Sequence, residues 1–172
     1  MRRPQATIIG DSDASLEACK TAEMIGELLA KYGIAVITGG RAGIMEYACK
    51  GARKAGGLTI GILPSDNVND ANDWCTVVIP TGFGHARNVL TVLAGDFVVA
   101  LGGAAGTLSE ICFAWIYNKP ILTLKGFEGW SERLGGTKLD HRRSDAIIVC
   151  KDMSELGKEI LVICKKLNLS ID

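Results

Sequence analysis

Residues 97–112 read FVVALGGAAGTLSEIC, an apolar run followed by a glycine turn and then by a helical pattern. Residues 34–49 read IAVITGGRAGIMEYAC and have the same organisation, with glycines at the same places in the turn. Short strands that are apolar at nearly every position are typical of a parallel sheet buried on both faces. Each stretch therefore predicts one strand–turn–helix unit of a parallel α/β fold.

The remainder of the chain continues this alternation of strands and helices. We expect strands at residues 6–9, 34–38, 58–63, 76–79, 97–101, 120–124 and 146–149. We expect helices at residues 15–32, 44–56, 85–94, 107–118 and 152–167. The alternation predicts a Rossmann-like, doubly wound, mostly parallel sheet of about seven strands with helices on both faces. No linker divides residues 1–172, so we expect a single domain.

Composition excludes several classes of protein. The chain is 48% apolar and carries 19 basic and 19 acidic residues, so it offers no bulk positive charge for a nucleic acid. No apolar run is long enough for a membrane helix or a signal peptide. The six cysteines are scattered without a C-x-x-C pair, which argues against a disulfide framework or a metal site. We expect a cytoplasmic protein with no membrane or nucleic-acid partner.

The two glycine turns are candidate anion sites. A glycine turn that opens a helix brings unpaired backbone amides close to a ligand, and those amides favour phosphate. Neither turn fits G-x-G-x-x-G after the first strand or G-x-x-x-x-G-K-[ST], so dinucleotide binding and a P-loop are disfavoured. The predicted phosphate- or nucleotide-binding residues are Gly39, Gly40, Gly43, Gly102, Gly103, Gly106 and Thr107. Because Thr107 accompanies only the second turn, we expect that turn to hold the phosphate and the first to shape the pocket.

Glu110 and Arg87 are the candidate catalytic residues. Glu110 lies one turn beyond the second glycine turn, where a carboxylate could hold ribose hydroxyls, activate water or stabilise positive charge on a sugar. The alternative is structural, since Thr107 and Glu110 also fit a capping box. Arg87 is expected in the first turn of a helix, where a cation is unfavourable unless an anion compensates it. Its alternative is a solvated surface arginine.

Two further segments have more than one interpretation. The helix expected at 107–118 is apolar nearly all round, so it is either deeply buried or part of a homodimer or homotetramer interface. Residues 125–145 form a glycine-rich segment that could be a lid, a subunit contact or a surface excursion. The two histidines, His85 and His141, are expected at the surface or in hydrogen bonds.

At these motifs the chain resembles the LOG-like, lysine-decarboxylase-like Rossmann proteins. That group includes the cytokinin-activating phosphoribohydrolases and the molybdenum cofactor carrier proteins. The family signature P-G-G-x-G-T-x-x-E is similar to residues 101–110, in which Leu101 replaces the proline and one extra residue precedes Gly106. Arg87 falls where the family has a catalytic arginine, and the Asn88 that follows it looks closer to the carrier branch.

The resemblance implies a small phosphorylated ligand and no obligatory cofactor. The first hypothesis is hydrolysis of the N-glycosidic bond of a nucleoside 5′-monophosphate, with Glu110 at the ribose and Arg87 positioning the phosphate or the sugar. The alternative is a non-catalytic carrier of molybdenum cofactor or of another phosphorylated pterin or nucleotide. A third hypothesis is a nucleotide sensor whose residues 125–145 contact a partner.

Overall fold

The computed structural model describes residues 2–171. The strands are β1 (Gln5–Gly10), β2 (Ala35–Thr38), β3 (Thr59–Leu63), β4 (Val77–Pro80), β5 (Phe97–Leu101), β6 (Ile121–Leu124) and β7 (Ile148–Cys150). The α-helices are α1 (Leu16–Lys31), α2 (Ile44–Lys54), α3 (Asn88–Ala94), α4 (Ala105–Ile116), α5 (Trp130–Leu134) and α6 (Met153–Lys166). Two short 3₁₀ helices, η1 (Val68–Asp70) and η2 (Gly84–Arg87), complete the secondary structure of this part of the chain.

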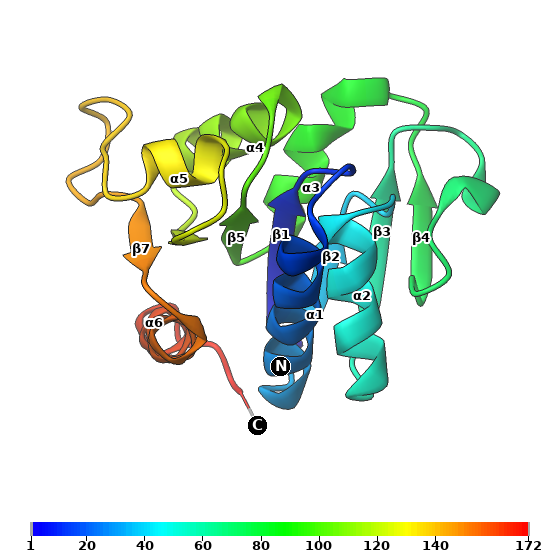
Figure 1. The fold of residues 1–172 in the computed structure, drawn as a ribbon, viewed down its shortest axis with the longest axis horizontal. Helices are drawn as coiled ribbons and strands as arrows, with labels where there is room; N and C mark the ends of the chain where they lie inside the picture. Colours follow the sequence, from blue (N-terminus) through cyan, green and yellow to red (C-terminus); the bar gives the residue numbers. More distant parts are fainter. Residues whose placement is uncertain (1, 172) are drawn as a thin grey trace.

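The strands of residues 2–171 form one sheet in the order β4-β3-β2-β1-β5-β6-β7 (Figure 1). Every neighbouring pair is parallel. The chain runs from β1 outward to β4, then returns to the centre and runs from β5 outward to β7. The predicted doubly wound α/β fold is confirmed, and the sheet is parallel throughout. The direction of winding reverses between β1 and β5, where open α/β sheets bind their ligands.

Helices cover both faces of the sheet, as Figure 1 shows. The five residues of β5 are all buried, and they alternate between two cores. Phe97, Val99 and Leu101 pack with residues of α1, α2 and α6, whereas Val98 and Ala100 pack with residues of α3 and α4. This arrangement explains why the strand is apolar at every position.

Helices α1 and α2 cross in close contact. A Cβ atom on Gly51 of α2 would lie 1.8 Å from the carbonyl oxygen of Glu23 on α1, so only glycine fits at this crossing. The contact fixes the position of α2 and of the glycine turn that precedes it.

The elements differ from the sequence-based expectations in three places. The helix expected at 85–94 is divided into η2 and α3, because the apolar pattern that favours an α-helix begins only after Arg87. The helix expected at 107–118 begins earlier, at Ala105. Helix α5 lies inside the 125–145 segment and, at five residues, is too short to show a helical period. No helix among residues 2–171 is both long and apolar enough to cross a bilayer.

Candidate functional site

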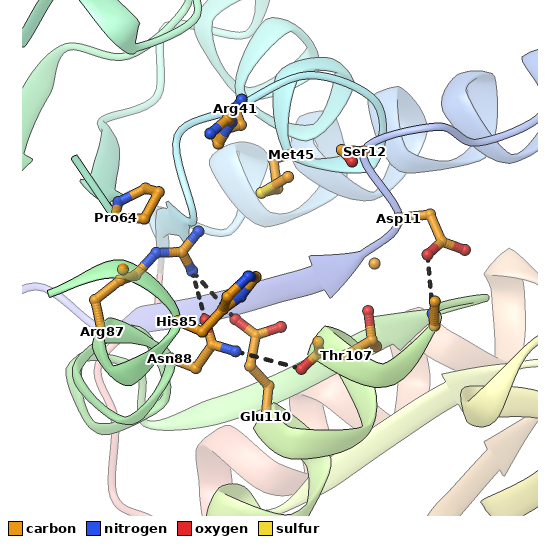
Figure 2. A pocket seen from close by; sticks show the side chains of 14 residues that line it. Asp11, Ser12, Arg41, Met45, Pro64, His85, Arg87, Asn88, Thr107 and Glu110 are labelled. Atoms are coloured by element: carbon orange, nitrogen blue, oxygen red, sulfur yellow. Dashed lines mark hydrogen bonds and ion pairs between the residues drawn. The ribbon is translucent and has the colours of Figure 1, made fainter.

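A cavity of about 400 Å³ opens at the carboxyl ends of β1 and β5, where the winding of the sheet reverses. Five segments line it (Figure 2): residues 10–12 at the end of β1, Arg41 and Met45 around the start of α2, Pro64 after β3, residues 84, 85, 87 and 88, and the beginning of α4. Its size falls within the range of small-molecule sites. Of the predicted site residues, Arg87, Gly106, Thr107 and Glu110 line this cavity.

Arg87 is the last residue of η2, and its side chain is buried rather than solvated. Its Nη1 atom donates to Asn88 Oδ1 (3.1 Å), to Thr91 Oγ1 (3.3 Å) and to the Glu110 carboxylate. Its Nη2 atom donates to the Gly39 carbonyl oxygen at 3.3 Å. The Nε atom has no partner within residues 2–171. Burial lowers the pKa of Arg87, and the Glu110 carboxylate opposes that shift.

Glu110 projects from α4 toward Arg87, and Figure 2 shows the two side chains pointing at one another. The Arg87 Nη1 to Glu110 Oε1 distance is 3.5 Å, and each residue is 7% exposed. Desolvation raises the pKa of Glu110 to about 7, although the Arg87 cation opposes the shift. A carboxyl group with that pKa is present in both protonation states near neutral pH. It can therefore both accept and donate a proton, as general acid–base catalysis requires.

The capping-box interpretation of Glu110 is wrong. Helix α4 begins at Ala105 with Ala104 as its N-cap, and no side chain caps it. Thr107 and Glu110 therefore lie inside the helix, too far along it to cap each other's backbone amides. The carboxylate of Glu110 is left to face Arg87 and the cavity.

The second glycine turn is held by a residue that the sequence analysis did not single out. Asp11, directly after β1, accepts hydrogen bonds from the Gly103 amide (3.0 Å) and the Ala104 amide (2.8 Å). These two amides are consequently occupied. The next three amides, of residues 105–107, have no hydrogen-bond partner among residues 2–171 and open the helix beside the cavity. These three amides remain available as hydrogen-bond donors.

The first glycine turn contributes shape, and its glycines lie outside the cavity lining. A Cβ atom on Gly39 would lie 2.5 Å from Arg87 Nη2, so this glycine makes room for the guanidinium group. Gly43 has φ +64° and packs against the Asp11 carbonyl oxygen, while Gly40 packs against β3. The turn reaches the cavity through Arg41, which is exposed. The expected partition between the two turns, with phosphate held by the second, stays a prediction.

Gly102 and Gly103 also lie outside the cavity lining and serve as a link to the 125–145 segment. The amides of Trp130 and Ser131, at the start of α5, donate to the carbonyl oxygens of Gly103 (2.9 Å) and Gly102 (3.0 Å). The start of α5 is therefore packed under the second glycine turn as a support, while most of the remaining residues of the 125–145 segment are exposed or half-buried.

Two polar residues of the cavity wall, Asn88 and His85, were only weakly indicated by the sequence. Asn88 is buried and donates to Ser109 Oγ at 2.8 Å, which ties α3 to α4. His85 is exposed and lines the cavity. Both lie within two residues of Arg87, so the prediction that Arg87 is a site residue could have pointed to them. Residues 2–171 contain no cluster of three or more His, Cys, Asp or Glu side chains that could hold a metal ion.

Fold and site together define a Rossmann-like protein with a ligand cavity at the reversal point of its sheet. The model of the SLOG cluster4 family matches residues 3–157, and the chain belongs to this family of LOG-like Rossmann proteins.

Three known proteins illustrate the relationship. A protein of Archaeoglobus fulgidus without an assigned function is 39% identical over 125 residues, which are 73% of this chain and 82% of that protein. The cytokinin riboside 5′-monophosphate phosphoribohydrolase of Rhodococcoides fascians is 26% identical over 151 residues, which are 77% of this chain and 75% of the enzyme. The molybdenum cofactor binding protein of Rippkaea orientalis superposes with a TM-score of 0.82 at 34% identity, covering 98% of this chain and 99% of that one.

Proposed function

We propose that this protein hydrolyses the N-glycosidic bond of a nucleoside 5′-monophosphate. The observation that carries the proposal is the Arg87–Glu110 pair, which is buried in the cavity wall. Its carboxylate belongs to α4, the helix whose first amides are free. Within residues 2–171 the buried Glu110 carboxylate has no hydrogen bond besides the one from Arg87, and such a carboxylate is costly for the fold, which supports a role in chemistry.

The phosphate group would bind at the start of α4. The free amides of residues 105–107 and the positive end of the helix dipole favour a dianion there. Arg41 lines the same cavity and is exposed, so it would supply a cation at the rim. Asp11 holds the preceding turn in place and occupies the amides that would otherwise compete for the phosphate.

Glu110 would act on the sugar. It lies about one helical turn beyond Thr107, about 5 Å further along the axis, and both residues line the cavity. Its carboxylate would take a proton from the attacking water as the water oxygen bonds to C1′. The bond from C1′ to the base nitrogen would break with its electron pair moving to the base, which receives that proton. The products are the free base and ribose 5-phosphate.

Arg87 would orient Glu110 and compensate its charge. Its contacts with Gly39, Asn88 and Thr91 fix the guanidinium group, so the carboxylate has a defined position. When the carboxylate takes a proton, the attraction between the pair weakens, and this favours return of the proton to the base. The similarity to the Rhodococcoides fascians phosphoribohydrolase supports the same reaction class.

The direct test is an assay of ribose 5-phosphate release from a panel of purine and pyrimidine nucleoside monophosphates. We expect turnover of at least one, and a decrease in kcat of about 100-fold or more in Glu110→Gln. Glu27→Gln is the matched control, because Glu27 pairs with Lys31 on the surface of α1 and is absent from the cavity lining. Absence of product from the whole panel would refute the proposal.

A second function, carriage of molybdenum cofactor or another phosphorylated pterin, is favoured by one observation. The molybdenum cofactor binding protein of Rippkaea orientalis is similar over almost the full length of both chains. The start of α4 would hold the pterin phosphate without turnover. Fluorescence of oxidised pterin that copurifies after expression with molybdate tests this function. Carriage should survive Glu110→Gln, whereas hydrolysis should not.

A further inference from the structure

Two cysteines that lie far apart in the sequence meet beside the first glycine turn. Cys49 belongs to α2 and is fully buried, while Cys75 lies just before β4 and is partly exposed. Their Sγ atoms are 4.0 Å apart. No other pair of thiols among residues 2–171 is hydrogen-bonded together. One thiol is thus reachable from solvent, and the other lies directly behind it.

The residues around the two cysteines leave space for the Cys75 sulfur and favour its ionisation over that of Cys49. A Cβ atom on Gly61 would lie 2.7 Å from Cys75 Sγ, so the glycine of β3 makes room for this sulfur. The hydrogen bond between the two thiols lowers the pKa of Cys75. The hydrogen bond to Cys75 and burial both raise the pKa of Cys49. Because the thiolate is the nucleophile in thiol chemistry, Cys75 is suited to react first and Cys49 second.

The turn that carries Cys75 is attached to the first glycine turn. The Asn72 amide donates to the Gly40 carbonyl oxygen, and Asn72 Nδ2 donates to the Arg41 carbonyl oxygen, each at 2.9 Å. A disulfide requires the two sulfurs to approach to about 2 Å. Cys49 lies on the buried face of α2 and Cys75 on a partly exposed turn, so closure of the bond would draw Cys75 and its turn inward.

We propose that Cys49 and Cys75 form a reversible disulfide by exchange with a small-molecule disulfide, and that its formation displaces the first glycine turn. The Cys75 thiolate attacks one sulfur of the small disulfide, breaks its S–S bond and releases one small thiol. The Cys49 thiolate then attacks Cys75 Sγ and releases the second small thiol. The protein loses two electrons and two protons, and the small disulfide gains them.

The test uses the full-length protein equilibrated with glutathione and its disulfide, followed by alkylation and peptide mapping. We expect the wild type to contain a Cys49–Cys75 bond and four alkylated cysteines out of six. Cys49→Ser should trap glutathione on Cys75, whereas Cys75→Ser should form neither product. Cys112→Ser is the matched control, because Cys112 is also partly exposed, and it should behave as wild type.

A second measurement tests the displacement. Amide hydrogen exchange in residues 39–43 and 71–76 should rise severalfold on oxidation, reverse with a reductant and stay unchanged in Cys75→Ser. Six free thiols in the wild type, or glutathione that remains on Cys75, would overturn the disulfide. Unchanged exchange across a formed disulfide would overturn the coupling to the glycine turn. Circular dichroism melting checks that each variant is folded, and an alanine variant replaces any serine variant that is not.

Discussion

The Asp11 carboxylate accepts a hydrogen bond from the Ala104 amide at 2.8 Å, and this contact joins the end of β1 to the start of α4. The second carboxylate oxygen accepts from the Gly103 amide. One side chain thus connects the two central strands at the point where the winding reverses, and it leaves the amides of residues 105–107 as the free donors of the site.

Asp11→Asn should loosen this connection. Asparagine offers one acceptor oxygen and turns an N–H group toward the loop, so one amide loses its partner. We expect a loss of about 1–3 kcal/mol in the free energy of unfolding, measured by urea denaturation. Asp13→Asn is the control, because Asp13 is an exposed neighbour, and it should change stability by less than about 0.5 kcal/mol. Equal stability of the two variants would contradict the role given to Asp11.

Gly106→Ala should separate stability from ligand binding. A Cβ atom on Gly106 has no atom within 4 Å, and its φ is not in the left-handed region, so the fold does not require glycine there. We expect stability to be unchanged or to rise by up to about 1 kcal/mol, since alanine favours the helix. The new methyl group would project beside the free amides, and affinity for a phosphorylated ligand should fall by about tenfold or more.

Isothermal titration with the ligand identified by the activity panel or by copurification measures this loss. Gly157→Ala on α6 is the comparison variant, because its Cβ would make only ordinary contacts, of 3.4 Å or more, far from the cavity. It should bind as wild type does. Full affinity in Gly106→Ala would place the phosphate elsewhere.

The sheet was predictable because each buried strand is marked by a run of apolar residues that can be recognised locally in the sequence. The runs at 34–37 and 97–101 are apolar throughout, and runs of this kind between helices indicate a parallel sheet that is buried on both faces. Helix α5 was not predictable, because five residues held by hydrogen bonds to Gly102 and Gly103 carry no periodic pattern. Its position depends on contacts that only the folded chain makes.

The candidate site was predictable only in part for the same reason. Thr107 and Glu110 follow a glycine turn in the sequence, so both could be recognised from spacing, and Arg87 stood out as a cation where a helix was expected to begin. Asp11 could not be recognised, because its partners are more than 90 positions away. The glycines of the first turn were expected at the ligand, but Gly39 instead accommodates Arg87.

Gly51→Ala tests the crossing of α1 and α2. The added methyl group would overlap the Glu23 carbonyl group, so the helices must separate. We expect a loss of about 1–3 kcal/mol or more in the free energy of unfolding, because overpacking displaces backbone that cannot adjust. Gly157→Ala again serves as the control and should be neutral or stabilising. Equal effects of both substitutions would show that the crossing tolerates a side chain.

Glu110 should make the stability of the protein depend on pH in a defined direction. Its pKa in the folded protein is about 7, above the ordinary value of 4.5 expected in the unfolded chain. Between these values the folded state binds more protons than the unfolded state, so stability is greatest below 4.5 and falls as pH rises toward 7. The slope for one proton is at most about 1.4 kcal/mol per pH unit.

Urea denaturation of wild type and Glu110→Gln from pH 4.5 to 8 measures this effect. The stability of the wild type relative to Glu110→Gln should decrease as the pH rises to about 7 and stay constant above it. Glu27→Gln should follow the wild type, since Glu27 is a surface residue of α1. A difference that does not vary with pH would mean that the carboxyl group titrates alike in both states, and the acid–base role of Glu110 would lose its physical basis.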